Sequence, residues 1–219
     1  MASHISQFLR LLQRYRAAHV FNPWTDRNRD DRGRNGPRAR RARLAAHLEV
    51  EARQLLIGEA PGYQGCRITG IPFTSERLLI AGEIPRVAHD GSRLSTRLRP
   101  WSEPSATILW SSLYELGIEG STVLWNAFPW HPHRRGECYS NRSPTRAECS
   151  GGLVILDALL EAMPQARLFA VGRHAQRALS VIGREAVLLR HPAQGGAVQF
   201  RRALRQAMRE PPAAADGTD

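Results

Sequence analysis

At residues 54–62 the sequence reads Gln54-Leu55-Leu56-Ile57-Gly58-Glu59-Ala60-Pro61-Gly62. A short apolar run that ends at a glycine is typical of a buried parallel strand leading into a loop. Three similar runs follow, with helical apolar spacing between them. Strands that alternate with helices predict a parallel sheet covered on both faces. We therefore expect a three-layer α/β/α fold with a central four-stranded parallel sheet, its strands at residues 54–57, 123–125, 168–171 and 186–189.

The length of 219 residues fits one α/β domain with additional segments. We assign residues 1–50 to an N-terminal helix and an arginine-rich arm, residues 51–210 to the globular domain, and residues 211–219 to a flexible tail. Eight of the seventeen residues from Arg27 to Arg43 are arginine. We expect this segment to be solvated or disordered, or to become ordered only on a polyanion.

The charge of the chain is unusual because all 31 basic residues are arginine and the net charge is +11. The lack of lysine excludes Schiff-base chemistry and a lysine-containing phosphate loop. The surplus of positive charge favours a polyanionic partner, most simply nucleic acid. A general bias towards arginine codons is an alternative that charge alone leaves open.

No apolar stretch approaches the roughly 20 residues that a bilayer span needs. Residues 1–16 have neither an uninterrupted apolar core nor a small-residue cleavage site. Three scattered cysteines are too few for a secreted disulfide framework. We expect a soluble, monomeric protein of the reducing cytoplasm that makes no contact with membranes.

The loops after the expected strands carry the unusual residues. In parallel sheets, ligands bind beyond the carboxyl ends of the strands, so the loops 58–63, 126–133 and 190–193 should border one crevice. In the first loop, the glycines let a ligand approach the backbone and Glu59 is able to hold a water molecule. Phe73, which follows Pro72, offers a flat face to a planar base. Taken alone, the same residues also describe an ordinary turn with a buried phenylalanine.

Two further polar residues follow strands. Asn126 ends a buried strand, where its amide needs a partner, and its donor and acceptor match the edge of a pyrimidine. A bond to the local backbone is the alternative. His191 is able to donate a hydrogen bond to an anion in the crevice, or merely to cap a helix.

In combination these motifs are far more specific. The runs Gly58-Glu59-Ala60-Pro61-Gly62 and Gly70-Ile71-Pro72-Phe73-Thr74, with Asn126 and His191-Pro192-Ala193, resemble the uracil-DNA glycosylase superfamily. The first motif is similar to that of the iron–sulfur branch, families 4 and 5, and the resemblance covers residues 55–200. It implies a uracil-DNA glycosylase that flips uracil out of DNA and hydrolyses its N-glycosidic bond with water, leaving an abasic site. The implied partners are uracil-containing DNA and free uracil as product, and the implied location is the nucleoid.

The resemblance also implies roles for single residues. Phe73 would stack on the flipped base, Asn126 would read the uracil edge, and His191 would stabilise negative charge on the departing uracil. The expected catalytic residues are Glu59, Asn126 and His191. The expected substrate-binding residues are Gly58, Ala60, Gly62, Tyr63, Phe73, Asn126 and His191. For DNA contact we expect Arg190, His133 and the loop Gln194-Gly195-Gly196, whose glycines allow it to fill the gap left by the flipped base.

The chain departs from the family pattern in three places. Ala60 replaces the aspartate of the family-1 motif, so we assign water activation to Glu59; the alternative is that the backbone and Asn126 position the water. Gly62 aligns with the family-1 tyrosine that excludes thymine, which leaves the rejection of 5-methyl pyrimidines open. The iron–sulfur branch has an N-terminal cysteine pair that is missing here, and we expect no cluster, no metal and no other cofactor.

Two alternatives to a glycosylase remain open at this point. The first is a catalytically weak uracil-DNA or nucleic-acid binding protein on the same fold, which the alanine at position 60 favours. The second is a zinc-dependent hydrolase that uses His131, His133, Cys138 and Cys149, although their spacing matches no standard site. We instead expect His131 and His133 on a DNA-facing loop, and Trp125 and Phe128 in the core.

Overall fold

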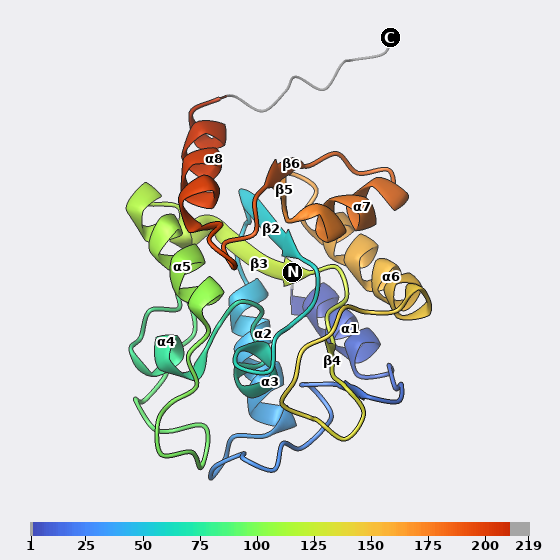
Figure 1. Cartoon of the computed structure of the whole chain (residues 1–219), viewed down its shortest axis with the longest axis vertical. Coiled ribbons are helices and arrows are strands. Elements are labelled where there is room, and N and C mark those ends of the chain that lie inside the picture. The colour runs from blue at the N-terminus through green and yellow to red at the C-terminus, as the bar shows by residue number, and fades with distance from the viewer. Residues whose placement is uncertain (1, 211–219) are drawn as a thin grey trace.

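The four expected strands form one parallel sheet in the order β3-β2-β5-β6 in a computed structural model that describes residues 2–210 (Figure 1). Each strand end lies within one residue of its predicted position. The expected α/β fold with a central four-stranded parallel sheet is therefore confirmed. The strands are β2 (Gln54–Gly58), β3 (Thr122–Asn126), β5 (Arg167–Val171) and β6 (Val187–Leu189).

Helices cover both faces of the sheet (Figure 1). Leu55 and Ile57 of β2 pack into the cluster on one face, whereas Leu56 packs into the cluster on the other. Successive side chains of a strand point to opposite faces, so a strand buried on both sides reads as a continuous apolar run. The first face is covered by α1 (Ala2–Leu12), α6 (Arg146–Ala162) and α7 (Arg173–Val181), and the second by α5 (Pro104–Leu116) and α8 (Ala197–Arg209).

The outer edge of β3 is covered by α2 (Pro37–Leu48). An edge strand presents unpaired backbone groups that need partners when buried. The Leu124 N–H donates to His47 Nε2 at 3.1 Å, and Arg86 donates to the Thr122 carbonyl at 3.1 Å. Burial lowers the pKa of His47 to about 3, so the ring stays neutral and accepts this bond. His47 of α2 and Arg86 thus satisfy backbone groups at the outer edge of β3.

The arginine-rich segment is folded, which corrects the expected solvated or disordered arm. Arg40 is buried in α2 and donates to the Asp31 carboxylate at 2.6 Å. The same guanidinium donates to the carbonyls of Pro23, at 2.5 Å, and Asp26, at 2.6 Å. A guanidinium with five donors is able to organise several chain segments at once. The number of arginines in this segment suggested disorder, because composition does not reveal which of them form hydrogen bonds with acceptors inside the protein.

A buried carboxylate organises the segment that leads into α5. Glu76, at the start of α4 (Glu76–Ile80), accepts backbone N–H groups from Leu94, Ser95 and Trp101, each at 2.9 Å. It also accepts the Ser95 hydroxyl at 2.6 Å and Arg93 Nε at 2.9 Å. Burial acts to raise the pKa of Glu76, but these bonds outweigh it and the pKa is lowered. Glu76 is a buried charge with a full set of partners.

Several small elements were not predicted from the sequence. The strands β1 (Val20–Phe21) and β4 (His131–Pro132) form a two-stranded antiparallel sheet. Two loops are interrupted by short helices, α3 (Cys66–Thr69) and the 3₁₀ helix η1 (Glu119–Ser121). Trp125 and Phe128 are buried in the core, as expected. None of the described helices is long and apolar enough to cross a membrane. The expected tail, residues 211–219, lies outside the described residues.

The substitution Arg40→Met should lower the free energy of unfolding by about 3 to 5 kcal/mol, because it leaves the buried Asp31 carboxylate without its ion-pair partner. Urea unfolding of the two proteins measures the difference. Arg38, an exposed residue of the same helix, provides the control, and Arg38→Met should change stability by less than about 0.5 kcal/mol. Equal effects of the two substitutions would contradict the structural role of Arg40.

Candidate active site

The register of the sheet brings the first two loops together. Gly58, the last residue of β2, pairs with Asn126, the last residue of β3. Beyond the strands, the Ala127 N–H donates to the Gly58 carbonyl at 2.8 Å, and the Phe128 N–H donates to the Glu59 carbonyl at 2.9 Å. The two loops therefore leave the carboxyl edge of the sheet side by side.

Gly58 is the point at which a ring and an amide meet. A Cβ atom at this position would lie 2.3 Å from Cζ of Phe73 and 2.7 Å from Oδ1 of Asn126. Cβ atoms do not approach other heavy atoms this closely, so only glycine leaves room for both side chains. Phe73 and Asn126, 53 positions apart in the chain, are thus brought into one cluster by the end of β2.

The Asn126 side chain is buried, and its Oδ1 has no hydrogen-bond partner among the described residues. Burying an unpaired amide oxygen costs free energy that the fold does not recover. Asn126 lies behind the Phe73 ring and does not line the neighbouring cavity. The amide oxygen, beside an aromatic ring, is therefore free to accept a hydrogen bond.

Phe73 has a strained backbone. Its φ of +51° lies in the left-handed region, which a bulky residue seldom adopts. The indole Nε1 of Trp110, in α5, donates to the Phe73 carbonyl at 3.0 Å and holds this conformation. Strain of this kind persists where the surroundings enforce it, often at functional sites.

The imidazole of His191 lies near the Phe73 ring, with 6.4 Å between the ring centroids. The Ala193 N–H donates to His191 Nδ1 at 3.1 Å, so a neutral ring carries its proton on Nε2. Burial lowers the pKa of His191, the Glu59 carboxylate opposes this effect, and Arg190 adds to it. At neutral pH the ring is uncharged and presents Nε2–H as a donor.

A cavity of about 760 Å³ lies between these loops and the start of α5. The expected site residues that line it are Glu59, Ala60, Gly62, Phe73, His191, Gln194 and Gly195. Other expected residues lie outside its lining. Tyr63 packs edge-on against Trp101, with 5.5 Å between the ring centroids. Gly58 and Asn126 lie behind Phe73, Arg190 is exposed beside His191, and Gly196 is buried under the turn.

The Glu59 side chain stands at the rim of the cavity. It is 33% exposed, and its Oε1 lies 3.5 Å from Nδ1 of His174 in α7. Its backbone carbonyl joins the two loops, as described above. The residue at position 60 offers only a methyl group to the cavity.

The cavity also contains a carboxyl group that sequence reasoning missed. Glu103 directly precedes α5, and its Oε1 accepts the Ser105 hydroxyl at 3.1 Å. Its Oε2 is buried without a hydrogen-bond partner among the described residues. Burial raises the pKa of Glu103 to about 7, although the Ser105 bond acts to lower it. Glu103 belongs to no motif, and its only sequence signal is an acidic residue directly before a helix-starting proline.

A sequence model described as the uracil DNA glycosylase superfamily matches residues 46–210. The chain belongs to this superfamily. Its fold is similar to the crystal structure of wild-type Pedobacter heparinus SMUG2, with a TM-score of 0.60, 14% sequence identity, and coverage of 94% of this chain and 99% of that one. No match was found among curated proteins.

The location of His131 corrects a prediction about this uracil DNA glycosylase superfamily member. His131 is buried in β4, accepts Arg67 Nη1 at 3.0 Å and donates to the Ser140 carbonyl at 2.9 Å. Burial and the adjacent Arg67 lower its pKa to about 3. It is therefore a satisfied internal residue and does not face DNA. His133 is half-buried and donates to the carbonyl of Arg134 at 2.9 Å.

The zinc alternative is wrong on the same geometry. Across residues 2–210, no three His, Cys, Asp or Glu side chains come close enough together to hold a metal ion. Both ring nitrogens of His131 are engaged by protein groups. Cys138 and Cys149 are free thiols.

The His191 imidazole should titrate below its ordinary pKa of 6.5 because burial disfavours the charged ring. Glu59→Gln should lower this pKa further, since the carboxylate stabilises the cation, whereas Arg190→Gln should raise it. NMR titration of the nitrogen-15-labelled imidazole, assigned by its loss in His191→Ala, measures these shifts. Glu137→Gln, at an exposed loop position, should leave the pKa unchanged. A wild-type pKa above 6.5 would contradict a half-buried ring that is neutral at pH 7.

Proposed function

We propose that this protein is a uracil-DNA glycosylase that hydrolyses the bond between uracil N1 and deoxyribose C1′, leaving an abasic site and free uracil. The observation that carries the proposal is the buried, unpaired Oδ1 of Asn126 beside the Phe73 ring. Uracil presents N3–H next to the O4 carbonyl, a donor and an acceptor in one plane. A single amide matches this edge, with Oδ1 accepting from N3–H and Nδ2 donating to O4.

To reach this amide the base must leave the duplex and the Phe73 ring must move aside, because Asn126 is buried and does not line the cavity. Flipping costs a few kcal/mol and is least costly for a weakly paired base, which favours uracil opposite guanine. Stacking of a base on an aromatic side chain such as Phe73 contributes about 1 to 3 kcal/mol and offsets part of this cost. The proposal therefore assigns Phe73 to capture and Asn126 to recognition.

His191 is assigned to the leaving group. Breaking the N-glycosidic bond leaves an electron pair on uracil, and the negative charge spreads over N1 and O2. A neutral Nε2–H donor interacts more strongly with this anion than with the neutral base, so it stabilises the transition state selectively. The chain contains no lysine that could form an imine with the sugar, which is consistent with a water nucleophile.

The second candidate function is uracil-DNA binding with little or no turnover. Ala60 favours it, because a methyl group is unable to activate water. This candidate predicts salt-sensitive retention of uracil-containing DNA with no abasic product. The two candidates differ in product formation alone.

The decisive assay uses a fluorescent oligonucleotide with a single uracil, followed by alkaline cleavage. We expect strand cleavage by the wild-type protein. Asn126→Ala should abolish most excision, and His191→Ala should reduce the rate by about 10² to 10³ with a weaker effect on DNA binding. Gln165→Ala removes an exposed amide outside the cavity and should leave the rate unchanged. An intact strand at stoichiometric protein, with DNA retained in a gel shift, would instead support the binding protein.

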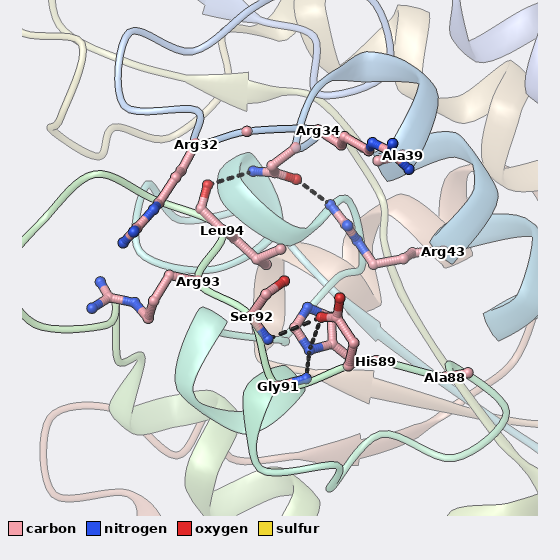
Figure 2. A pocket seen from close by; sticks show the side chains of 13 residues that line it. Arg32, Arg34, Ala39, Arg43, Ala88, His89, Gly91, Ser92, Arg93 and Leu94 are labelled. Atoms are coloured by element: carbon pink, nitrogen blue, oxygen red, sulfur yellow. Dashed lines mark hydrogen bonds and ion pairs between the residues drawn. The ribbon is translucent and has the colours of Figure 1, made fainter.

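Exposed arginines of segment 32–43 are assigned to the DNA backbone. Arg32 and Arg34 line a second cavity, of about 980 Å³, between this segment and residues 88–94 (Figure 2). Asn35 joins the two walls, since its Nδ2 donates to the Leu94 carbonyl at 3.0 Å and its Oδ1 accepts Arg43 at 2.6 Å. Within residues 2–210, Arg32 and Arg34 have no ion-pair partner.

The double substitution Arg32→Gln with Arg34→Gln should make DNA binding less sensitive to salt. Each phosphate contact contributes about 0.9 to the slope of log K against log salt, so the slope should fall by about 2. Base preference should not change, because phosphate contacts carry no sequence information. Arg202→Gln with Arg209→Gln, on exposed positions of α8, provides the control. Equal slopes for the two double variants would contradict the assignment.

A further inference from the structure

Two carboxylates near α4 and α5 have opposite environments. Glu76 accepts hydrogen bonds from five donors, and its pKa is lowered despite burial. Glu103 accepts one, from the Ser105 hydroxyl, and its second oxygen is buried with no partner among the described residues. Buried carboxylates in proteins normally have partners, so Glu103 requires an explanation that Glu76 does not.

The Glu103 carboxyl faces the first motif. A Cβ atom at Gly65 would lie 1.9 Å from Oε2 of Glu103, and a Cβ atom at Gly62 would lie 3.9 Å from Oε1. Glycine at position 65 therefore leaves the space that the carboxyl group occupies. Glu103 also lines the cavity, together with Phe73 and His191. A carboxylate from a distant part of the chain thus lies against the loop whose own residue 60 has no polar atom in its side chain.

The Glu103 side chain forms no hydrogen bond with the backbone at the start of α5. It occupies the N-cap position of α5, where an acidic side chain usually accepts a helix N–H, yet it makes no capping bond. No arginine or histidine forms an ion pair with it among residues 2–210. Its burial is compensated only by the Ser105 hydroxyl, as expected of a group that acts on a bound molecule.

We propose that Glu103, rather than Glu59, is the general base that activates the hydrolytic water, an inference that rests on the glycosylase function proposed above. The Glu103 carboxylate takes a proton from water as the water oxygen forms a bond to C1′. The bond from C1′ to uracil N1 breaks, and its electron pair leaves with uracil as an anion stabilised by His191. The proton later passes from Glu103 to uracil or solvent, so no further reactant is needed.

The competing carboxylate is less suited to this role. The Glu59 carboxyl lies at the rim, partly exposed and 3.5 Å from His174. A general base is most effective when its pKa is near the working pH and water is excluded around it. Glu103 meets both conditions, since burial raises its pKa to about 7.

The pH dependence of single-turnover uracil excision tests the inference. The wild-type rate should rise through an apparent pKa near 7, as Glu103 loses its proton. Glu103→Gln should reduce the rate at pH 8 at least 100-fold and remove this rise. Ser105→Ala should move the rise to higher pH, because the Ser105 hydroxyl stabilises the ionised carboxylate. Glu115→Gln, at the other end of α5, should change neither the rate nor the profile.

Each outcome discriminates between the proposals. Thermal unfolding and uracil-DNA binding establish whether Glu103→Gln is folded, and if it is not, the shift in Ser105→Ala decides the question. No excision by the wild-type protein would overturn the proposed function and this inference with it. Excision by the wild-type protein, with the pH profile retained in Glu103→Gln or unmoved in Ser105→Ala, would overturn only the role of Glu103. Loss of the rise in Glu59→Gln instead would assign the base to Glu59.

Discussion

The close approach of Phe73 and Asn126 to the backbone of Gly58 is the constraint on which the site depends. The parallel register of β2 and β3 sets Asn126 beside Gly58, and the strained turn at Phe73 brings the ring to the same point. Because no side chain fits at Gly58, the spacing between ring and amide is fixed by main-chain geometry. A rigid sheet edge thus positions the recognition groups, and the more exposed residues around His191 complete the cavity.

Hydrogen bonding distinguishes Asn126 and Glu103 from the buried polar residues Arg40, Glu76 and His131. Arg40, Glu76 and His131 are buried, and each is engaged by protein donors or acceptors. Asn126 and Glu103 each retain a buried oxygen without a protein partner among the described residues. The first group holds segments of the fold together. In the second group, each unpaired oxygen carries a desolvation cost that a hydrogen bond from a bound molecule would offset. A preorganised site differs from a core in this respect.

The sheet could be predicted from the sequence because burial on both faces makes its strands continuous apolar runs. The loops of the candidate site followed from the strand ends. The folding of the arginine-rich segment could not be predicted, since the acceptors of Arg40 lie in irregular backbone. Glu103 was missed because its role depends on the burial of one side chain across a cavity. His131 was misplaced because its partners, Arg67 of α3 and the Ser140 carbonyl, are brought to it only by the tertiary fold.

Side chains from two parts of the chain cover the outer edge of β3. His47 and Arg86 occupy backbone groups along the outer margin of the strand that carries Asn126. Most of α2 precedes the region matched by the superfamily. A chain that began after this helix would lack His47 and leave the Leu124 N–H at the strand edge without its acceptor, open to pairing with a strand from another molecule. His47 and Arg86 therefore shield the edge of the strand that ends at Asn126 from pairing with another chain.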